Sequence, residues 1–248
     1  MVARGLARED DFRVQEAAMV AWRKLGLDSL DDDALSLAER SPFDGIRYLA
    51  RPDADVSDLR TRFGLSMHDA REPNDYCARG TPVDDRAQAV DLARSLGIPD
   101  RQETPYGISA GAVSASYKQG NMTYFAYDRG EFGGGLIRVS PDGSQDVAYQ
   151  GNVTFIAPVS ATAQTGPAWV FAGLNHMMSQ GSLQRLDDGV VSFVTTLPSA
   201  VVGLAQEGDD YILSFHRAEA EPKRWQSSQT PLRLSPDGTL SPACPRAN

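Results

Sequence analysis

One short phrase occurs three times in the second half of this chain. An alternating apolar and polar segment that contains an arginine runs into an Asp-Gly turn at residues 136–143, 183–189 and 232–238. The successive Asp-Gly pairs are 46 and 49 residues apart. A period of this length predicts one supersecondary unit used three times, which restricts the fold to repeat architectures.

The repeated phrase has the chemistry of a β-hairpin. Two copies read Ser-Pro-Asp-Gly, where proline sets φ at the second turn position and glycine accepts a positive φ. In the middle copy Asp187 stands at the proline position. Each phrase is preceded by an aromatic run and, before that, by a small apolar run; these six runs lie at 124–127, 169–172 and 211–215, and at 108–114, 153–159 and 201–204.

These runs predict four antiparallel strands in each unit of ~47 residues, which is the size of a β-propeller blade. Three units fall short of the ~4–8 blades of closed propellers. The β domain is therefore expected to be either propeller-like or an open meander, and the sequence leaves both arrangements open.

The first hundred residues have a helical period instead. We predict helices over 10–25, 31–40 and 81–96, a further short helix over 57–63, and a lone strand over 43–49. The composition changes at 99–105. The predicted fold class is α+β, with a mainly helical region at 1–100 followed by a repeat-built antiparallel β domain at 101–248.

The formal net charge of −9 argues against a nucleic-acid partner, because phosphate contacts need a basic face. It favours a basic protein partner. No apolar run approaches the ~20 residues of a membrane span. The start carries no leader pattern, which predicts a cytoplasmic protein; a leader removed ahead of Met1 would instead make it periplasmic or secreted, and the compartment is left unknown.

The two cysteines, Cys77 and Cys244, are too few for a disulfide scaffold. They are able to form one bridge that ties the N-terminal part to the last strand, or to remain two separate thiols. The sequence does not decide between these two states of the cysteines. It also leaves open whether the protein forms a homodimer.

Ser109 lies in Gly107-Ile108-Ser109-Ala110-Gly111, which fits the G-x-S-x-G pattern of a nucleophile elbow. The segment resembles the serine motif of patatin-like lipases. An elbow, however, needs a buried strand before the serine and a helix after it, whereas polar residues precede Ser109 and extended patterns follow it. The alternative interpretation is a small-residue strand where neighbouring strands crowd together.

The three histidines, His68, His176 and His216, have no metal-ligand spacing. His68 with Asp69, Asp75 and Cys77 is a weak candidate for a thiol or metal site. No phosphate-binding or dinucleotide motif is present. We therefore predict no metal and no cofactor; Ser109, His176 and His216 are the alternative catalytic residues.

Three equivalent loops separate the aromatic strand from the arginine-bearing strand, at 128–134, 174–181 and 216–230. If the units are true repeats, these loops open on the same side, and loops on a rigid scaffold are where recognition usually resides. Exposed Trp, Met and Arg side chains often anchor interfaces. The predicted binding residues are Arg129, Phe132, His176, Met177, Arg217, Arg224 and Trp225.

These patterns favour a non-catalytic binding protein that recognises another protein through the β-domain loops or an acidic face. By analogy, an acidic domain without catalytic motifs is compatible with a bacterial inhibitor or toxin-neutralising immunity protein. The alternatives are a serine hydrolase that uses Ser109 and a binder of glycans or small ligands at the repeat loops.

Overall fold

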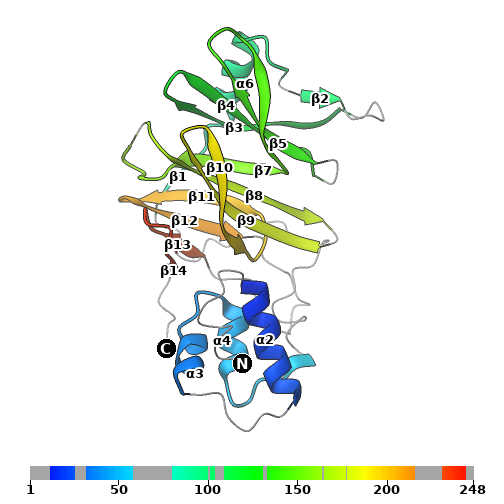
Figure 1. Cartoon of the computed structure of the whole chain (residues 1–248), viewed down its shortest axis with the longest axis vertical. Helices are drawn as coiled ribbons and strands as arrows, with labels where there is room; N and C mark the ends of the chain where they lie inside the picture. Colours follow the sequence, from blue (N-terminus) through cyan, green and yellow to red (C-terminus); the bar gives the residue numbers. More distant parts are fainter. Residues whose placement is uncertain are drawn as a thin grey trace.

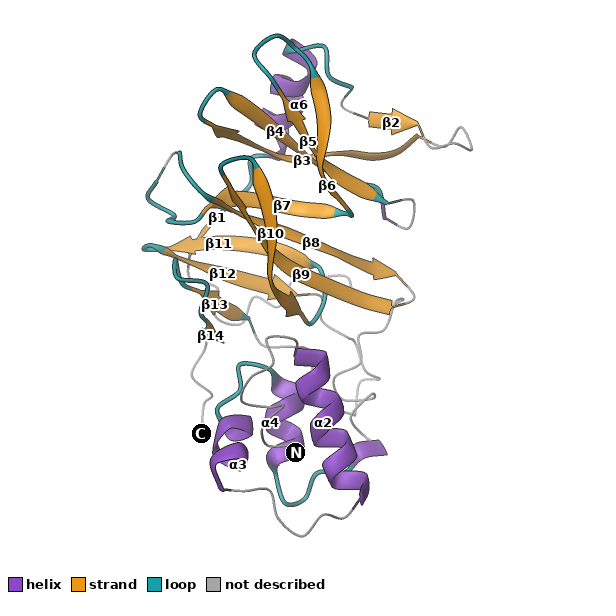
Figure 2. Ribbon diagram, viewed as in Figure 1, coloured by secondary structure: helices purple, strands orange, loops and turns teal. Residues whose placement is uncertain are grey.

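The computed structural model describes residues 12–25, 32–57, 80–99, 101–103, 109–130, 133–163, 165–176, 178–215 and 231–243. Within these residues the protein is mainly antiparallel β with four helices, as Figures 1 and 2 show. The predicted α+β class and the three repeated sheets are confirmed. The sheets do not close into a barrel within the described residues, and a propeller-like ring is not confirmed.

Each repeat unit forms one antiparallel meander of four strands. The first sheet contains β3 (Ser109–Gln119), β4 (Met122–Asp128), β5 (Gly134–Val139) and β6 (Gln145–Gln150), with β2 (Arg101–Glu103) beside β3. The second contains β7 (Val153–Pro158), β8 (Ala168–His176), β9 (Met178–Asp187) and β10 (Val190–Leu197). The third contains β11 (Val201–Glu207), β12 (Asp210–Phe215), β13 (Leu232–Leu234) and β14 (Leu240–Pro242), with β1 (Thr81–Pro82) beside β11.

The repeated phrase forms the turn between the third and fourth strand of every unit. In the first copy the Gly143 amide donates to the Ser140 carbonyl over 2.9 Å, and in the last copy the Gly238 amide donates to Ser235 over the same distance. The turn glycines have φ values from 80° to 89°, a conformation that L side chains rarely adopt. The local turn chemistry therefore produces the hairpins that the sequence predicts.

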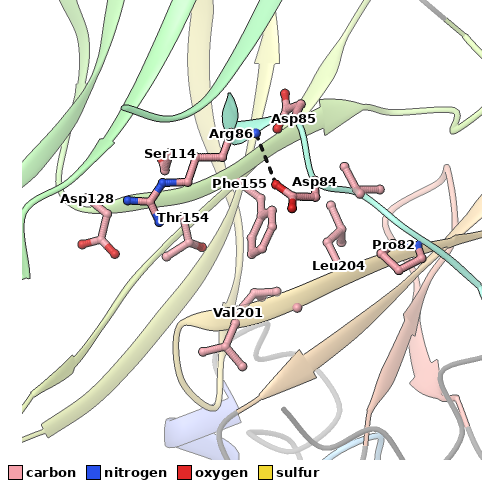
Figure 3. A pocket seen from close by; sticks show the side chains of 13 residues that line it. Pro82, Asp84, Asp85, Arg86, Ser114, Asp128, Thr154, Phe155, Val201 and Leu204 are labelled. Carbon is pink, nitrogen blue, oxygen red and sulfur yellow. Dashed lines mark hydrogen bonds between the residues drawn. The ribbon is translucent and has the colours of Figure 1, made fainter. Parts of the chain in front are cut away.

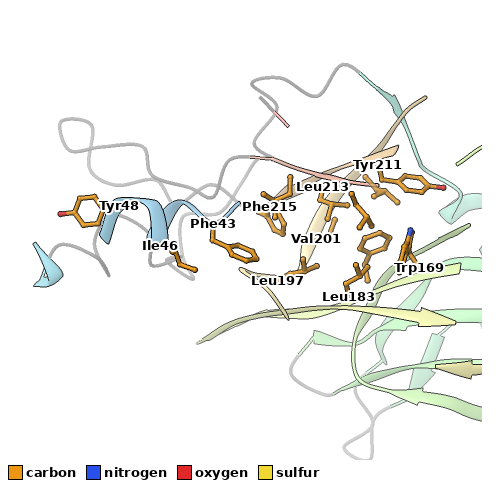
Figure 4. Packing of buried hydrophobic residues seen from close by; sticks show 14 of the residues in the cluster. Phe43, Ile46, Tyr48, Trp169, Leu183, Leu197, Val201, Tyr211, Leu213 and Phe215 are labelled. Carbon is orange, nitrogen blue, oxygen red and sulfur yellow. The ribbon is translucent and has the colours of Figure 1, made fainter. Parts of the chain in front are cut away.

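The three sheets stack one on another, and apolar side chains fill each interface. Tyr124, Leu136, Ile156 and Val170 belong to the core between the first and second sheets. Trp169, Leu183 and Leu213 belong to the core between the second and third. Figure 4 shows this second core continuing to the helices through Phe43, which lies near Phe215.

Helices close both ends of the stack (Figure 1). At one end α6 (Arg86–Ser95) packs Ala89 and Ala93 against Val113 and Phe125 of the first sheet. At the other end lie α2 (Phe12–Leu25), α3 (Asp32–Glu39) and α4 (Asp44–Ala50), whose buried residues share one core with the second and third sheets. The N-terminal residues thus cover the β units from two sides.

Two local predictions are wrong. Residues 43–49, predicted as a strand, form helix α4 from Asp44 onward. Every residue of this helix except Arg47 is buried, and Arg47 pairs with Asp44 one turn earlier. A short apolar run fits both periods, and only its packing partners decide between them. The helix predicted over 81–96 begins at Arg86, because Thr81 and Pro82 pair with β11 as strand β1. The helix predicted over 57–63 lies almost wholly outside the described residues.

Candidate functional site

A pocket of about 530 Å³ opens where the first strands of the three units converge. Ser114 of β3, Thr154 and Phe155 of β7, and 201–204 of β11 contribute to its wall, together with Asp128 at the end of β4. The segment 82–86 runs along the remaining side and adds Asp84, Asp85 and Arg86 to the lining (Figure 3). We call this hollow the axial pocket.

The segment that carries these charges is held by both of its flanks. Thr81 and Pro82 pair with β11, and the Val83 amide donates to the Leu204 carbonyl over 2.8 Å. Gly80 permits this approach, since a Cβ atom there would lie 2.4 Å from the Gln206 carbonyl oxygen. From Arg86 onward the chain becomes α6, which packs on the first sheet. The charges are therefore fixed between the first and third units.

Carboxylates outnumber cations in the axial pocket. Among the described residues that line it, Asp84, Asp85 and Asp128 stand with one guanidinium, that of Arg86, which extends toward Asp128 and Thr154 in Figure 3. Among the described residues this guanidinium makes no ion pair within 4.0 Å. The pocket therefore has a negative balance that suits a cationic group.

The carboxyl group of Asp85 is half-buried. Burial raises the pKa of this group above the ordinary value, and the neighbouring Asp84 charge acts in the same direction, while the Ser116 amide, 3.5 Å from Oδ2, opposes it. The other acids have local partners: Asp84 Oδ1 accepts from the Arg86 amide at 3.4 Å and Asp128 Oδ1 from the Gly130 amide at 3.0 Å. A cation in the pocket would favour the ionised form of Asp85.

The structure brings two of the three predicted binding loops together. Gly130 and Gly133 of the first loop line a hollow of about 400 Å³ with Leu174 and Gly181 of the second. Asn152 joins them: its Oδ1 accepts from the Arg129 amide at 3.0 Å, its Nδ2 donates to the Gly130 carbonyl at 2.5 Å, and its carbonyl accepts from the Gly173 amide at 2.9 Å. The third loop, 216–230, lies outside the described residues.

Arg129 is the one predicted binding residue whose side chain is described, and it lies in the first loop. His176 ends β8 opposite Met178 in the backbone pairing of the β8–β9 hairpin. The remaining predicted residues lie outside the described part of the chain: Phe132, Met177, His216, Arg217, Arg224 and Trp225. Their roles stay predictions.

Ser109 is the first residue of β3 and pairs with Glu103 of β2. The chain continues from it as strand to Gln119, so the strand-to-helix turn of a nucleophile elbow does not follow the serine. The hydrolase alternative therefore depends on the sequence motif alone.

The remaining candidates for a thiol or metal site are the residues around His68 and the two cysteines. His68, Asp69, Asp75 and the two cysteines lie outside the described residues. Where the structure is described, no three His, Cys, Asp or Glu side chains gather in a way that would hold a metal ion. No described helix has the length and apolarity needed to cross a bilayer.

Sequence reasoning missed the axial pocket. It took Asp84 and Asp85 for the start of a helix, and it placed Asp128 only as the first residue of a loop. The available signal was position: Ser114, Thr154 and Val201 belong to the first strands of the predicted units, and such strands share one side of a stacked repeat. No local motif marks residues that meet only after three sheets have packed.

Comparison of the chain with protein-family models, with curated proteins and with solved structures found no match.

Proposed function

We propose that this protein is a non-catalytic binding protein that recognises another protein, and that a lysine or arginine side chain of the partner enters the axial pocket. The observation that carries the proposal is the position of Asp84, Asp85 and Asp128 around one pocket formed by all three repeat units. We also propose that the units form an open meander, with this pocket on the shared side of their first strands.

The axial pocket is large enough to admit a lysine or arginine side chain. Binding clefts of ~300–1,000 Å³ take small groups into concave, mainly apolar surroundings with a few placed polar groups. The axial pocket, at about 530 Å³, combines the apolar side chains of Phe155, Val201 and Leu204 with charges in its lining. The methylene stem of a lysine or arginine would contact the apolar wall while its charge meets the carboxylates.

The charge of the whole chain supports the same partner. A net charge of −9 attracts a basic protein over long range and accelerates its association, an effect that weakens as salt rises. Pocket carboxylates would then provide the specific contact. We accordingly expect the affinity to fall with ionic strength.

The test is capture of a stoichiometric partner from a lysate of the source cell by the tagged protein. The pocket variant Asp84→Asn/Asp85→Asn/Asp128→Asn should lose the partner. A matched control with the same charge change at exposed sites, Asp53→Asn/Asp91→Asn/Asp188→Asn, should retain it. Equal capture by both triple variants would show that the axial pocket is not the contact.

The captured partner also tests the narrower prediction that the protein is an inhibitor or an immunity protein. If the captured partner is an enzyme or toxin, adding the purified protein should reduce its activity, and the pocket variant should not. A partner that is bound but unaffected would leave recognition as the function and remove inhibition.

A further inference from the structure

A third pocket, of about 410 Å³, lies beside the first binding loop. It is lined by Tyr127, which precedes the loop, by Arg129 and Gly133 of the loop itself, and by Ile137, Val147 and Gln150 of β5 and β6. Tyr127 and Ile137 also belong to the core that α6 covers. Asp128 and Arg129 are adjacent in the chain, yet Asp128 lines the axial pocket and Arg129 lines this one, which we call the Arg129 pocket.

The Arg129 side chain has a buried donor without an acceptor. Its Nε atom is screened from solvent and finds no hydrogen-bond partner among the described residues. Its backbone, by contrast, is fixed, because the amide donates to Asn152. Buried donors in proteins are nearly always paired, and an unpaired one costs about 1–3 kcal/mol. The arginine is thus held in place at its base with its donor unused.

The residues that line the Arg129 pocket indicate what kind of molecule would supply an acceptor. Among the described residues, the lining besides Arg129, Gln150 and the glycines consists of Tyr127, Ile137 and Val147. Val147 is 55% exposed, a large fraction for an apolar residue in a pocket wall. A guanidinium presents its donors in a planar fork that matches a carboxylate, and the apolar wall suits a hydrocarbon group next to that carboxylate.

We infer that the Arg129 pocket binds a carboxylate carried on an apolar group, with the Arg129 guanidinium donating to the carboxylate oxygens. Two sources share this chemistry: a free organic acid and the carboxyl terminus of a chain that ends in an apolar residue. The inference does not depend on the axial pocket, whose charge balance is opposite.

The test uses the full chain labelled with ¹⁵N and follows the Nε–Hε signal of Arg129 by NMR. Benzoate should shift this signal in a saturable way, whereas benzamide, its neutral analogue, should not. In a second arm, a short peptide that ends in valine with a free carboxyl group is compared with its amidated form. If both benzoate and the free peptide shift the signal, the shared chemistry is supported. Tighter binding of the peptide would identify a chain terminus as the source of the carboxylate, and tighter binding of benzoate would identify a free acid.

Two variants keep the inference falsifiable. Arg129→Lys retains the charge but lacks the fork, and should weaken benzoate binding about tenfold or more. Binding in every variant is followed through the backbone amide signals of Gly133 and Gly135, which line the same pocket. Val147→Glu, at an exposed position of the same pocket, should supply a competing carboxylate and reduce binding without unfolding the chain. Arg51→Lys, an exposed change on the distant helical layer, is the control. No shift of the Arg129 signal with either probe, or unchanged binding in both pocket variants, would overturn the inference.

Discussion

Gly181 passes so close to Ser199 that a Cβ atom on the glycine would lie 2.0 Å from the Ser199 carbonyl oxygen. Gly134 is also close to a link residue, Asn152: a Cβ atom on this glycine would lie 2.2 Å from the Tyr127 carbonyl oxygen, 2.6 Å from Asn152 Oδ1 and 2.8 Å from Asn152 Cα. Both glycines lie on the third strand of a unit, where the link from the fourth strand to the next unit passes. The close contact between a third-strand glycine and the link to the next unit is therefore repeated along with the hairpins. It is possible only because glycine has no side chain.

Replacing Gly181 by alanine should destabilise the fold by at least ~2 kcal/mol, because the new methyl group meets backbone rather than a movable side chain. The free energy of unfolding in urea measures this. Gly97→Ala is the matched control: its φ of 67° is unfavourable for alanine, but nothing lies within 4 Å of the added atom, so a cost of only ~1–2 kcal/mol is expected. A Gly181 variant as stable as the Gly97 variant would contradict the close contact.

Phe43 connects the N-terminal helices to the β units. Its side chain is 7% exposed and belongs to the core that contains Leu197 and Phe215. Phe43→Ala should lower the free energy of unfolding by ~3 kcal/mol or more. Phe193→Ala, at a position 57% exposed, should change it by less than ~0.5 kcal/mol. Equal effects of the two changes would mean that the helices do not depend on this contact.

Asp85 should make the stability depend on pH. Because burial raises its pKa in the folded protein, its contribution is fully present below the ordinary value of 3.8 and is lost as pH rises through the higher folded value. Asp85→Asn should therefore stabilise the protein at neutral pH, by less than ~1 kcal/mol since the group is partly solvated. The gain should shrink toward acid in urea unfolding at several pH values; a gain that stays constant with pH would show that the carboxyl charge is not its cause.

The protonation state of Asp85 should also change the affinity of the axial pocket for a cationic partner. An arginine-rich peptide that uses the axial pocket should bind more tightly as pH rises through the Asp85 pKa, since the cation prefers the ionised carboxylate. In Asp85→Asn this pH dependence should be reduced while that of the control Asp91→Asn remains. Fluorescence anisotropy of the labelled peptide measures it, and identical pH profiles for the wild type and Asp85→Asn would exclude Asp85 from the contact.

Ser109 should not react with a fluorophosphonate probe, because it begins a strand and no elbow turn follows it. The measurement is the intact mass after incubation, with an active serine hydrolase as the positive control. Labelling that disappears in Ser109→Ala would replace the binding function with the hydrolase alternative.

Features that depend on residues close together in the chain could be predicted from the sequence, whereas features that depend on distant residues could not. The turn at Ser140 and its counterparts was predictable, because proline and glycine restrict φ within four residues. Strand alternation beside the turns was also predictable, because successive side chains of a strand point to opposite faces of the sheet. Residues 43–49 were not, since their short apolar run becomes helix only when Ile46 and Leu49 find their core. Strand β1 was also missed, because its partner β11 lies more than a hundred residues away.

The sequence by itself determined that three hairpin-pair units follow a helical region, because turn residues and apolar alternation act locally. Only the tertiary structure decided that Asp85 and Asp128 line one pocket and that Arg129, next to Asp128, lines another. Segments distant in the chain approach each other through the packing of whole sheets, and that packing depends on side-chain volumes summed over the core rather than on any motif.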